Sequence, residues 1–180
     1  SDRKQKVAFT NHLYLTSQVL VQRKPDNWRT MAWAALQSRL KHDAIDLIGD
    51  TVAVRKQSAY LKRMGNLSEE LGDTIYIDTL PGNLSTERII KMVVDREIPY
   101  TVADENLAKV NAAYYPVLDI EVPASFSQRI AWAVRKNAPE LQAAINAWIA
   151  KEKKEAPYYV IYNRYFENQR NFRRRIRSDF

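Results

Sequence analysis

The stretch REIPYTVADENLAKVNAAYYP, residues 96–116, gives the clearest indication of the fold. An apolar run from Tyr100 to Ala103 predicts a short buried strand, and it ends abruptly at a polar triplet that begins with Asp104. Helical spacing follows as far as Ala113, so the chain is expected to pass directly from a strand into a helix. In sheets of parallel strands, ligands bind beyond the carboxyl ends of the strands, and Asp104 lies at such an end.

Short β-rich runs alternate with amphipathic segments along most of the chain. Strands are predicted at residues 13–23, 50–55, 74–78, 100–103, 117–122 and 129–136. Helices are predicted at residues 25–41, 58–71, 86–93, 105–113, 139–149 and 157–166. This alternation predicts an α/β fold with a mostly parallel central sheet that is covered by helices on both faces.

Residues typical of helix ends support several of these boundaries. Ser85 and Asn137 are expected to cap helices, Pro139 and Pro157 stand where helices begin, and Gly72 is a stop signal. The helix over residues 25–41 is predicted from apolar residues that recur at helical spacing, namely Trp28, Met31, Ala32, Ala35 and Leu36.

The composition argues against several kinds of site. The chain has 180 residues, 46% of them hydrophobic, and its lack of cysteine rules out disulfides and cysteine-ligated zinc. His12 and His42 are not paired at a metal-ligand spacing, and no glycine-rich phosphate-binding motif is present. Adjacent acidic residues point apart on a strand or lie about 100° apart on a helix, so none forms a natural catalytic dyad. No catalytic residue, metal or cofactor is therefore expected.

The two ends of the sequence carry separate expectations. The N-terminal SDRKQKVAF lacks the apolar core of a signal peptide and has the character of mid-domain sequence, so we expect a piece of a longer chain. Residues 164–180 hold six arginines against one glutamate and one aspartate, which is 6 − 2 = +4 of the formal net charge of +7. Such a tail suits nucleic acid, anionic lipid or an acidic partner, but a solvated linker is the simpler interpretation. No nucleic-acid recognition motif accompanies it.

Asp104 has two interpretations from the residues alone. Its carboxylate could cap the following helix by accepting a hydrogen bond from an N–H group of the first turn, and composition slightly favours this role. Alternatively, a carboxylate at the end of an apolar strand could accept a ligand ammonium. Gln57 and Ser58 stand at a second strand end, directly after TVAVRK, and could face the same place.

Several motifs resemble, in order and spacing, the amino-acid-type periplasmic solute-binding proteins. RKQKVAFTNHLYLTSQVLVQRK resembles the basic run and strand that enter the second lobe, and LIGDTVAVRKQSAYLK resembles a strand with its ligand-facing turn. YTVADENLA resembles the strand that ends in a ligand-binding aspartate, and RIAWAVRKNAPELQAAINAWI resembles the closing strand and its helix. Within this fold, YTVADENLAKVNAAYYPVL, RIAWAVRK and VIYNRYF are similar to the regulatory domain of the membrane-bound lytic murein transglycosylase F family.

The resemblance implies a periplasmic-binding-protein-like lobe and a division of the chain. Residues 1–24 correspond to a crossing strand from a first lobe that is mostly absent, and residues 25–136 to the second lobe. Residues 137–166 correspond to C-terminal helices, and residues 167–180 to a basic linker toward a downstream catalytic domain.

The same resemblance implies four ligand-binding residues. Arg3 matches the arginine that grips a ligand carboxylate, for which a bidentate guanidinium is suited. Asp104 matches the aspartate that accepts a ligand ammonium. Gln57 and Ser58 match a turn that offers backbone N–H and hydroxyl groups, where the family often has glycine. Tyr14 is expected to pack rather than to contact the ligand.

The function implied by the resemblance is a non-catalytic sensor domain that binds a muropeptide or an amino acid and regulates peptidoglycan cleavage by a downstream domain. Its location would be the periplasm, with attachment to the outer membrane and contact with peptidoglycan through parts of the parent outside this chain. No lysozyme-like catalytic signature follows residue 166, so the chain itself is not expected to be an enzyme, and nucleic acid is not expected as a partner. The alternative is a free-standing periplasmic amino-acid-binding component of an ABC transporter, against which the basic tail argues.

Overall fold

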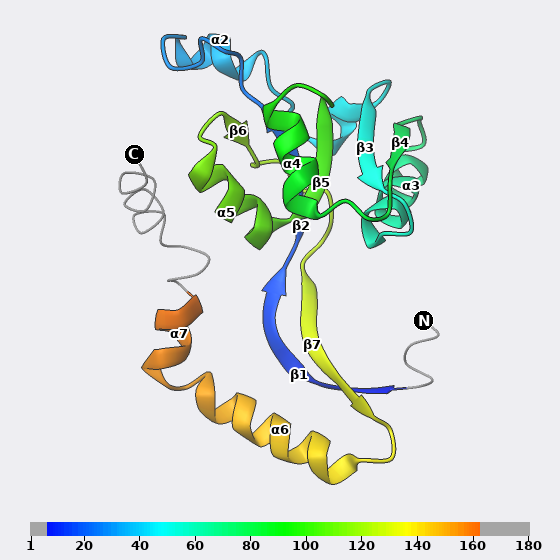
Figure 1. The fold of residues 1–180 in the computed structure, drawn as a ribbon, viewed down its shortest axis with the longest axis vertical. Coiled ribbons are helices and arrows are strands. Elements are labelled where there is room, and N and C mark those ends of the chain that lie inside the picture. Colours follow the sequence, from blue (N-terminus) through cyan, green and yellow to red (C-terminus); the bar gives the residue numbers. More distant parts are fainter. Residues whose placement is uncertain (1–6, 163–180) are drawn as a thin grey trace. The chain divides into compact units, whose positions relative to one another are not determined.

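The computed structural model describes residues 7–162, which form two compact units. Within this range, unit 1 consists of residues 7–16 and 127–162, and unit 2 consists of residues 17–126 (Figure 1). Unit 2 holds the predicted strand–helix alternation and, among the candidate ligand contacts, Gln57, Ser58 and Asp104.

Unit 2 is built on a five-stranded sheet with the order β4-β3-β5-β2-β6. Its strands are β2 (Gln18–Arg23), β3 (Thr51–Arg55), β4 (Tyr76–Leu80), β5 (Tyr100–Asp104) and β6 (Leu118–Asp119). β3 pairs in parallel with β4 and β5, whereas β2 is antiparallel to both β5 and β6. The α/β prediction is confirmed, but the sheet is mixed rather than mostly parallel in its pairings. The reason is that β2 runs against its two neighbours.

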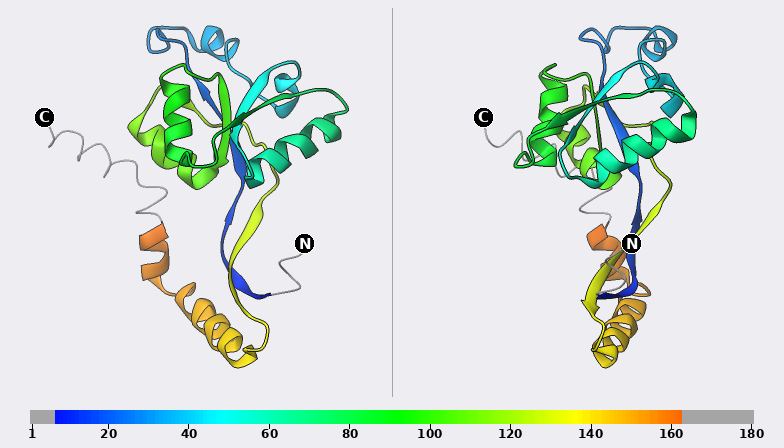
Figure 2. Two further views of the ribbon diagram at one scale, coloured as in Figure 1. Left: turned by 45° about the vertical axis from the view of Figure 1, so that its right-hand side comes forward. Right: turned by 90° about the vertical axis from the view of Figure 1, so that its right-hand side faces the viewer.

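Helices cover both faces of this sheet, as predicted. The helices are α3 (Ala59–Leu71), α4 (Thr86–Val94) and α5 (Glu105–Tyr114). Successive residues of each central strand point to opposite faces. Val21 and Ala103 therefore pack with α4 and α5 in one buried cluster, and Leu20 and Val102 pack with α3 in another. Figure 2 shows α3 on one side of the sheet and α4 and α5 on the other.

Two of the predicted helix-end signals in unit 2 are confirmed. Ser85 precedes α4, and its hydroxyl oxygen accepts a hydrogen bond from the Arg88 amide at 3.2 Å. Gly72 ends α3 in the left-handed conformation with a φ of 69°, which suits a residue without a Cβ atom.

The predicted long helix over residues 25–41 is wrong. Only α2 (Trp33–Gln37) is helical there, and a 3₁₀ turn, η1, follows at Ala44–Leu47. None of the residues of α2 is buried, and the side chain of Trp33 is 75% exposed. Helical spacing stabilises a helix in a protein mainly when its apolar face packs on a core, and this segment has no such surface beneath it.

Unit 1 contains β1 (Val7–Thr16) paired antiparallel with β7 (Gln128–Arg135), followed by α6 (Pro139–Glu152) and α7 (Ala156–Tyr162). Trp132 of β7 and Trp148 of α6 stack with ring centroids 5.9 Å apart. Pro139 begins α6 as predicted, but Asn137 does not cap it, because the N-cap is Ala138 and no side chain caps the helix.

Two predicted strands have different bounds in the structure, and the end of the last predicted helix is not described. The strand expected at residues 13–23 is two strands, β1 and β2, separated at Ser17 and placed in different sheets. The strand expected at residues 117–122 is regular only over β6. The last helix is described as far as Tyr162, so the remainder of its predicted range and the basic tail lie outside the described residues.

Candidate functional site

Three strand-to-helix junctions of unit 2 lie at one edge of the sheet, which we call the carboxyl edge. β3, β4 and β5 run in the same direction, and each is followed by a helix: α3, α4 and α5 respectively. The N-termini of three helices therefore meet this edge. Each N-terminus presents free N–H groups and about half a positive elementary charge. This is the position at which α/β sheets bind ligands.

Asp104 is a half-buried acid at the carboxyl edge. It occupies the N-cap position of α5, yet its side chain makes no capping hydrogen bond, so the capping interpretation is wrong for its carboxylate. The Tyr60 hydroxyl of α3 lies close enough to the Asp104 carboxylate to lower the pKa of Asp104. Burial raises the pKa of Asp104 above its usual value, and the neighbouring Tyr60 hydroxyl only partly opposes this effect. The carboxylate is thus incompletely compensated and would gain from a cation.

Tyr60 links the three junctions, although the sequence analysis places it only within the helix predicted over residues 58–71. Its hydroxyl also lies near the side chain of Thr86, the first residue of α4, which acts to lower the pKa of Tyr60. Burial and the nearby Asp104 carboxylate raise the pKa of the Tyr60 hydroxyl. The available signal was its place in the first turn of a helix that begins at a strand's carboxyl end, where a hydroxyl can reach the neighbouring junctions.

Gln57 and Ser58 lie at the same edge, at the junction of β3 and α3. Gln57 has a φ of 57°, a left-handed conformation that costs a non-glycine residue about 1–2 kcal/mol. This backbone matches the expectation of a turn at which related proteins often carry glycine. The Ser58 hydroxyl donates to the Arg55 carbonyl at 2.7 Å and accepts from the Leu61 amide at 3.2 Å, so it caps α3.

Glu105, next to Asp104, is in the opposite electrostatic situation. Burial alone would raise its pKa, but hydrogen bonds from Lys109 and Ser17 hold the pKa of this carboxyl below its usual range. The Ser17 hydroxyl donates to it at 2.8 Å, and the Lys109 ammonium lies 3.0 Å away. Glu105 is therefore already compensated by the protein, and Asp104 is the acid that a ligand could engage.

Two buried amide side chains accompany Asp104. Gln18 pairs with Asp104 in the β2–β5 ladder, and Asn106 lies in the first turn of α5. Within residues 7–162, Gln18 Oε1 and Asn106 Nδ2 are buried atoms without a hydrogen-bond partner. Unpaired buried polar atoms cost free energy, so an acceptor and a donor remain available near Asp104. Sequence analysis did not single out either residue.

The other predicted contacts are not at this edge. Arg3 lies outside the described residues, so the structure does not place it. Tyr14 belongs to β1 of unit 1, where its ring centroid lies 6.4 Å from that of Tyr162. Within residues 7–162 there is no group of three or more histidine and acidic side chains that could hold a metal ion. The helices of this range include none that is long and apolar enough to cross a membrane.

The fold is that of the periplasmic-binding-protein-like α/β proteins. An ancestral arginine-binding protein bound to arginine superimposes on 92% of this chain, and on 67% of its own length, with a TM-score of 0.68 and 21% identity. The substrate-binding protein AbpA of an amino acid ABC transporter from Streptococcus pneumoniae, bound to L-arginine, superimposes on 94% of this chain and 65% of its own, with a TM-score of 0.67 and 18% identity. These likenesses establish the fold class.

The chain belongs to the family of bacterial extracellular solute-binding proteins, family 3, whose sequence profile matches residues 1–168. Membrane-bound lytic murein transglycosylase F of Desulfosudis oleivorans is 38% identical over 120 residues, which is 67% of this chain and 26% of that protein. The namesake from Pseudoalteromonas translucida is 29% identical over 122 residues, or 66% of this chain and 25% of its own length. The chain thus spans about a quarter of the curated relatives that it matches.

Proposed function

We propose that this chain is a non-catalytic ligand-sensing domain of a lytic murein transglycosylase. It binds a cell-wall peptide or an amino acid and regulates the cleavage of peptidoglycan by a domain elsewhere in the same protein. The proposal includes a periplasmic location with attachment to the outer membrane through other parts of that protein. The similarity to transglycosylase F proteins supports the enzymatic context, and the family of extracellular solute-binding proteins supports the binding role.

The observation that carries the proposal is the half-buried Asp104 carboxylate at the carboxyl edge. Burial raises its pKa, and the neighbouring Tyr60 hydroxyl offsets this effect only in part. An α-ammonium group would relieve this cost through a charge-assisted hydrogen bond. The N-termini of α3, α4 and α5 at the same edge favour a carboxylate. One edge can therefore receive both charged groups of an amino acid or of a peptide's terminal residue.

Gln57 and Ser58 would help to bind the carboxylate of the ligand. The left-handed backbone at Gln57 turns the chain into α3, so the first N–H groups of the helix face the ligand side. Ser58 holds that turn through its bonds to Arg55 and Leu61. Arg3 would grip the ligand carboxylate, as the family resemblance implies. A ligand that fits only one arrangement of the parent protein would shift its population toward that arrangement, and so control activity.

Calorimetry on the protein that contains residues 1–180, with a disaccharide-tetrapeptide muropeptide as titrant, tests the binding step. We expect saturable binding that Asp104→Ala weakens at least tenfold, because the ligand ammonium loses its partner. Peptidoglycan release by the whole protein, measured with and without the muropeptide, tests the regulatory step. Binding without any change of activity would leave a sensor role unsupported, and no binding by the native protein would contradict the proposal.

An amino-acid-binding component of an ABC transporter is the second candidate. It is favoured by the structural likeness to transporter-associated proteins such as AbpA, with a TM-score of 0.67. Titration with L-arginine and other free amino acids separates the two candidates. Tight binding of a free amino acid, with no affinity for muropeptides, would favour the transporter component. The reverse preference would favour the sensor.

A further inference from the structure

A second polar region lies in unit 2, at the edge of the sheet where β2 ends and β5 begins. A cavity of about 560 Å³ opens there, lined by residues 22–26, 39, 93, 96 and 98–100. Four of its side chains are cationic, Arg23, Lys24, Arg39 and Arg96, and one is anionic, Asp26. The formal charge of the lining is 4 − 1 = +3. No residue of the carboxyl edge discussed above contributes to it.

Asp26 demonstrates that the arginines of this cavity can converge on one anion. Its carboxylate accepts a hydrogen bond from Arg23 Nη1 at 2.8 Å and is also paired with the Arg96 guanidinium. The side chain of Asp26 is 64% exposed, so solvent can replace it at little cost. Its position therefore marks a place where two guanidinium groups from distant parts of the sequence reach the same oxygen atoms.

The backbone at Arg96 is unusual for a long cationic residue. Arg96 directly follows the C-cap of α4 and has a φ of 66°. The Arg96 amide donates to the Val93 carbonyl at 3.2 Å, and the Glu97 amide donates to the Met92 carbonyl at 2.9 Å. This is the Schellman arrangement, whose left-handed position is usually glycine. The left-handed conformation is strained for arginine, so its presence here indicates a role for the side chain. That side chain lines the cavity.

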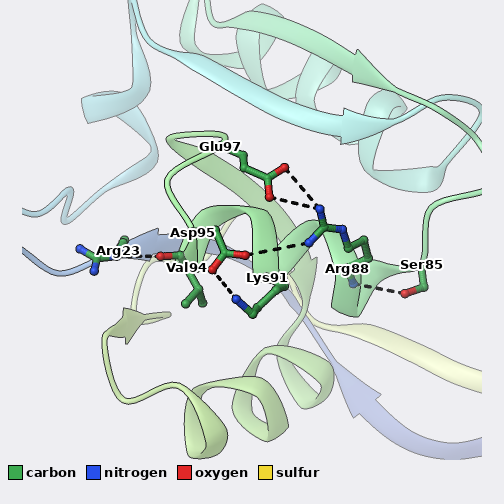
Figure 3. Close-up of polar contacts among 7 residues, drawn as sticks. All are labelled: Arg23, Ser85, Arg88, Lys91, Val94, Asp95 and Glu97. Carbon is green, nitrogen blue, oxygen red and sulfur yellow. Dashed lines mark hydrogen bonds and ion pairs between the residues drawn. The ribbon is translucent and has the colours of Figure 1, made fainter.

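The acidic neighbours of Arg96 are neutralised elsewhere, as Figure 3 shows. Asp95 is paired with Lys91, and Glu97 lies 3.1 Å from Arg88 Nη2. Both acids therefore have their own cations on α4 and leave the charge of Arg96 to the cavity.

The remaining cations of the cavity differ in whether their side chains already form hydrogen bonds or ion pairs within the protein. Arg23 donates through Nε to the Val94 carbonyl at 2.9 Å, which fixes it beside the end of α4. The Lys24 ammonium donates to the Pro116 carbonyl at 3.1 Å. The exposed guanidinium of Arg39 has no ion pair with any side chain in residues 7–162. Arg39, and Arg96 whose partner Asp26 is exposed, are thus the cations best able to turn to an incoming anion.

We propose that this cavity binds a phosphate group. A single carboxylate, that of Asp26, leaves three positive charges in excess, and a phosphate group brings up to two negative charges and three acceptor oxygens. Guanidinium forks match that geometry through paired N–H···O bonds. The phosphate can belong to a soluble phosphorylated compound or, as a phosphodiester with one negative charge and two free oxygens, to the headgroup of an anionic lipid, because both present phosphate oxygens to Arg39 and Arg96.

Calorimetry of the 180-residue chain with sodium pyrophosphate at low ionic strength tests the site. Arg39→Ala and Arg96→Gly should each weaken the affinity at least fivefold, whereas Lys62→Ala, which removes an exposed lysine of α3, should change it less than twofold. The arginines of residues 164–180 are the same in every variant, so any binding there cancels in the comparison. Arg96→Gly should also raise the melting temperature, which separates lost binding from lost folding.

Two further measurements decide the source and can overturn the proposal. Cosedimentation with vesicles of phosphatidylglycerol in phosphatidylcholine tests for a lipid headgroup. A lower bound fraction for Arg39→Ala and Arg96→Gly would identify the lipid as the source of the phosphate. If the two variants weaken only pyrophosphate binding, the source is a soluble phosphate compound. Asp26→Asn should tighten pyrophosphate binding at least twofold. Asp78→Asn, which neutralises an exposed acid outside the cavity lining, is the matched control. Absence of binding to both probes, binding indifferent to Arg39 and Arg96, or weaker binding by Asp26→Asn would each contradict the proposal.

Discussion

Each edge of the unit 2 sheet carries an aspartate, and the pKa values of these two aspartates are shifted in opposite directions. Asp104, at the carboxyl edge, is half-buried, and burial raises its pKa. Asp26, at the opposite edge, is exposed, and hydrogen bonds from Arg96 and then Arg23 lower its pKa. One edge holds an acid that lacks a cation, and the other holds cations in excess of acids. The difference teaches that each edge favours a ligand of opposite charge: an ammonium at Asp104 and an anion near Arg96.

The largest expected effect comes from the core that both edges share. Leu20, in β2, is fully buried beneath the ladder that joins residues 18–22 to residues 100–104. Leu20→Ala should lower the free energy of unfolding by about 2–5 kcal/mol, because it removes a buried side chain and leaves a cavity. Chemical denaturation measures the loss. Leu15→Ala, at a half-exposed position of unit 1, is the control, and an equal loss there would contradict the assignment of Leu20 to a core common to both edges.

The next largest effect separates the edges by ligand. Asp104→Ala should weaken muropeptide or amino-acid binding at least tenfold, or about 1.4 kcal/mol, and Tyr60→Phe should weaken it less, because only the support of the carboxylate is lost. Asp26→Ala should leave that affinity unchanged. Calorimetry on the same preparation measures all three, and equal losses for Asp104→Ala and Asp26→Ala would break the comparison between the two edges.

Both edges carry a strained residue, and each can be relieved. Gln57 and Arg96 are the non-glycine residues with positive φ in the described part of the chain. Gln57→Gly and Arg96→Gly should each raise the free energy of unfolding by about 1 kcal/mol, since glycine adopts the left-handed conformation without a steric penalty. Thermal denaturation checks the gain. Gly72→Ala, at the left-handed end of α3, is the reverse control and should destabilise.

The smallest effect is the pH dependence that Asp104 contributes. A carboxyl whose folded pKa is raised binds its proton more tightly in the folded protein, so its destabilising effect is absent below the unfolded pKa and complete above the folded pKa. Asp104→Asn should therefore raise the melting temperature at neutral pH, and the difference from the native protein should shrink as the pH falls through the range of these two values. A difference that grows on acidification would show that burial does not dominate at Asp104.

Much of the fold was predictable from local patterns. Short apolar runs and helical spacing located β3, α3, α4, β5 and α5 to within a few residues, and end signals such as Ser85 and Gly72 marked several of their boundaries. The helix over residues 25–41 could not be judged in this way, since spacing says nothing about whether a core lies beneath it. Ala32 and Ala35 have the spacing of core residues, yet both are exposed.

The sequence by itself determined that Asp104 ends a buried strand and begins a helix, and that Gln57 and Ser58 do the same one strand away. Only the tertiary structure decided what each polar group does there. Parallel pairing of β3 and β5 brings Tyr60 to Asp104, and antiparallel pairing of β2 with β5 brings the end of one strand, near Arg23, to the start of the other, near Arg96. Burial raises the pKa of Asp104, whereas paired arginines lower the pKa of Asp26, although the two side chains are chemically identical. The sequence alone does not show this difference, because desolvation and charge pairing depend on contacts between residues far apart in the chain.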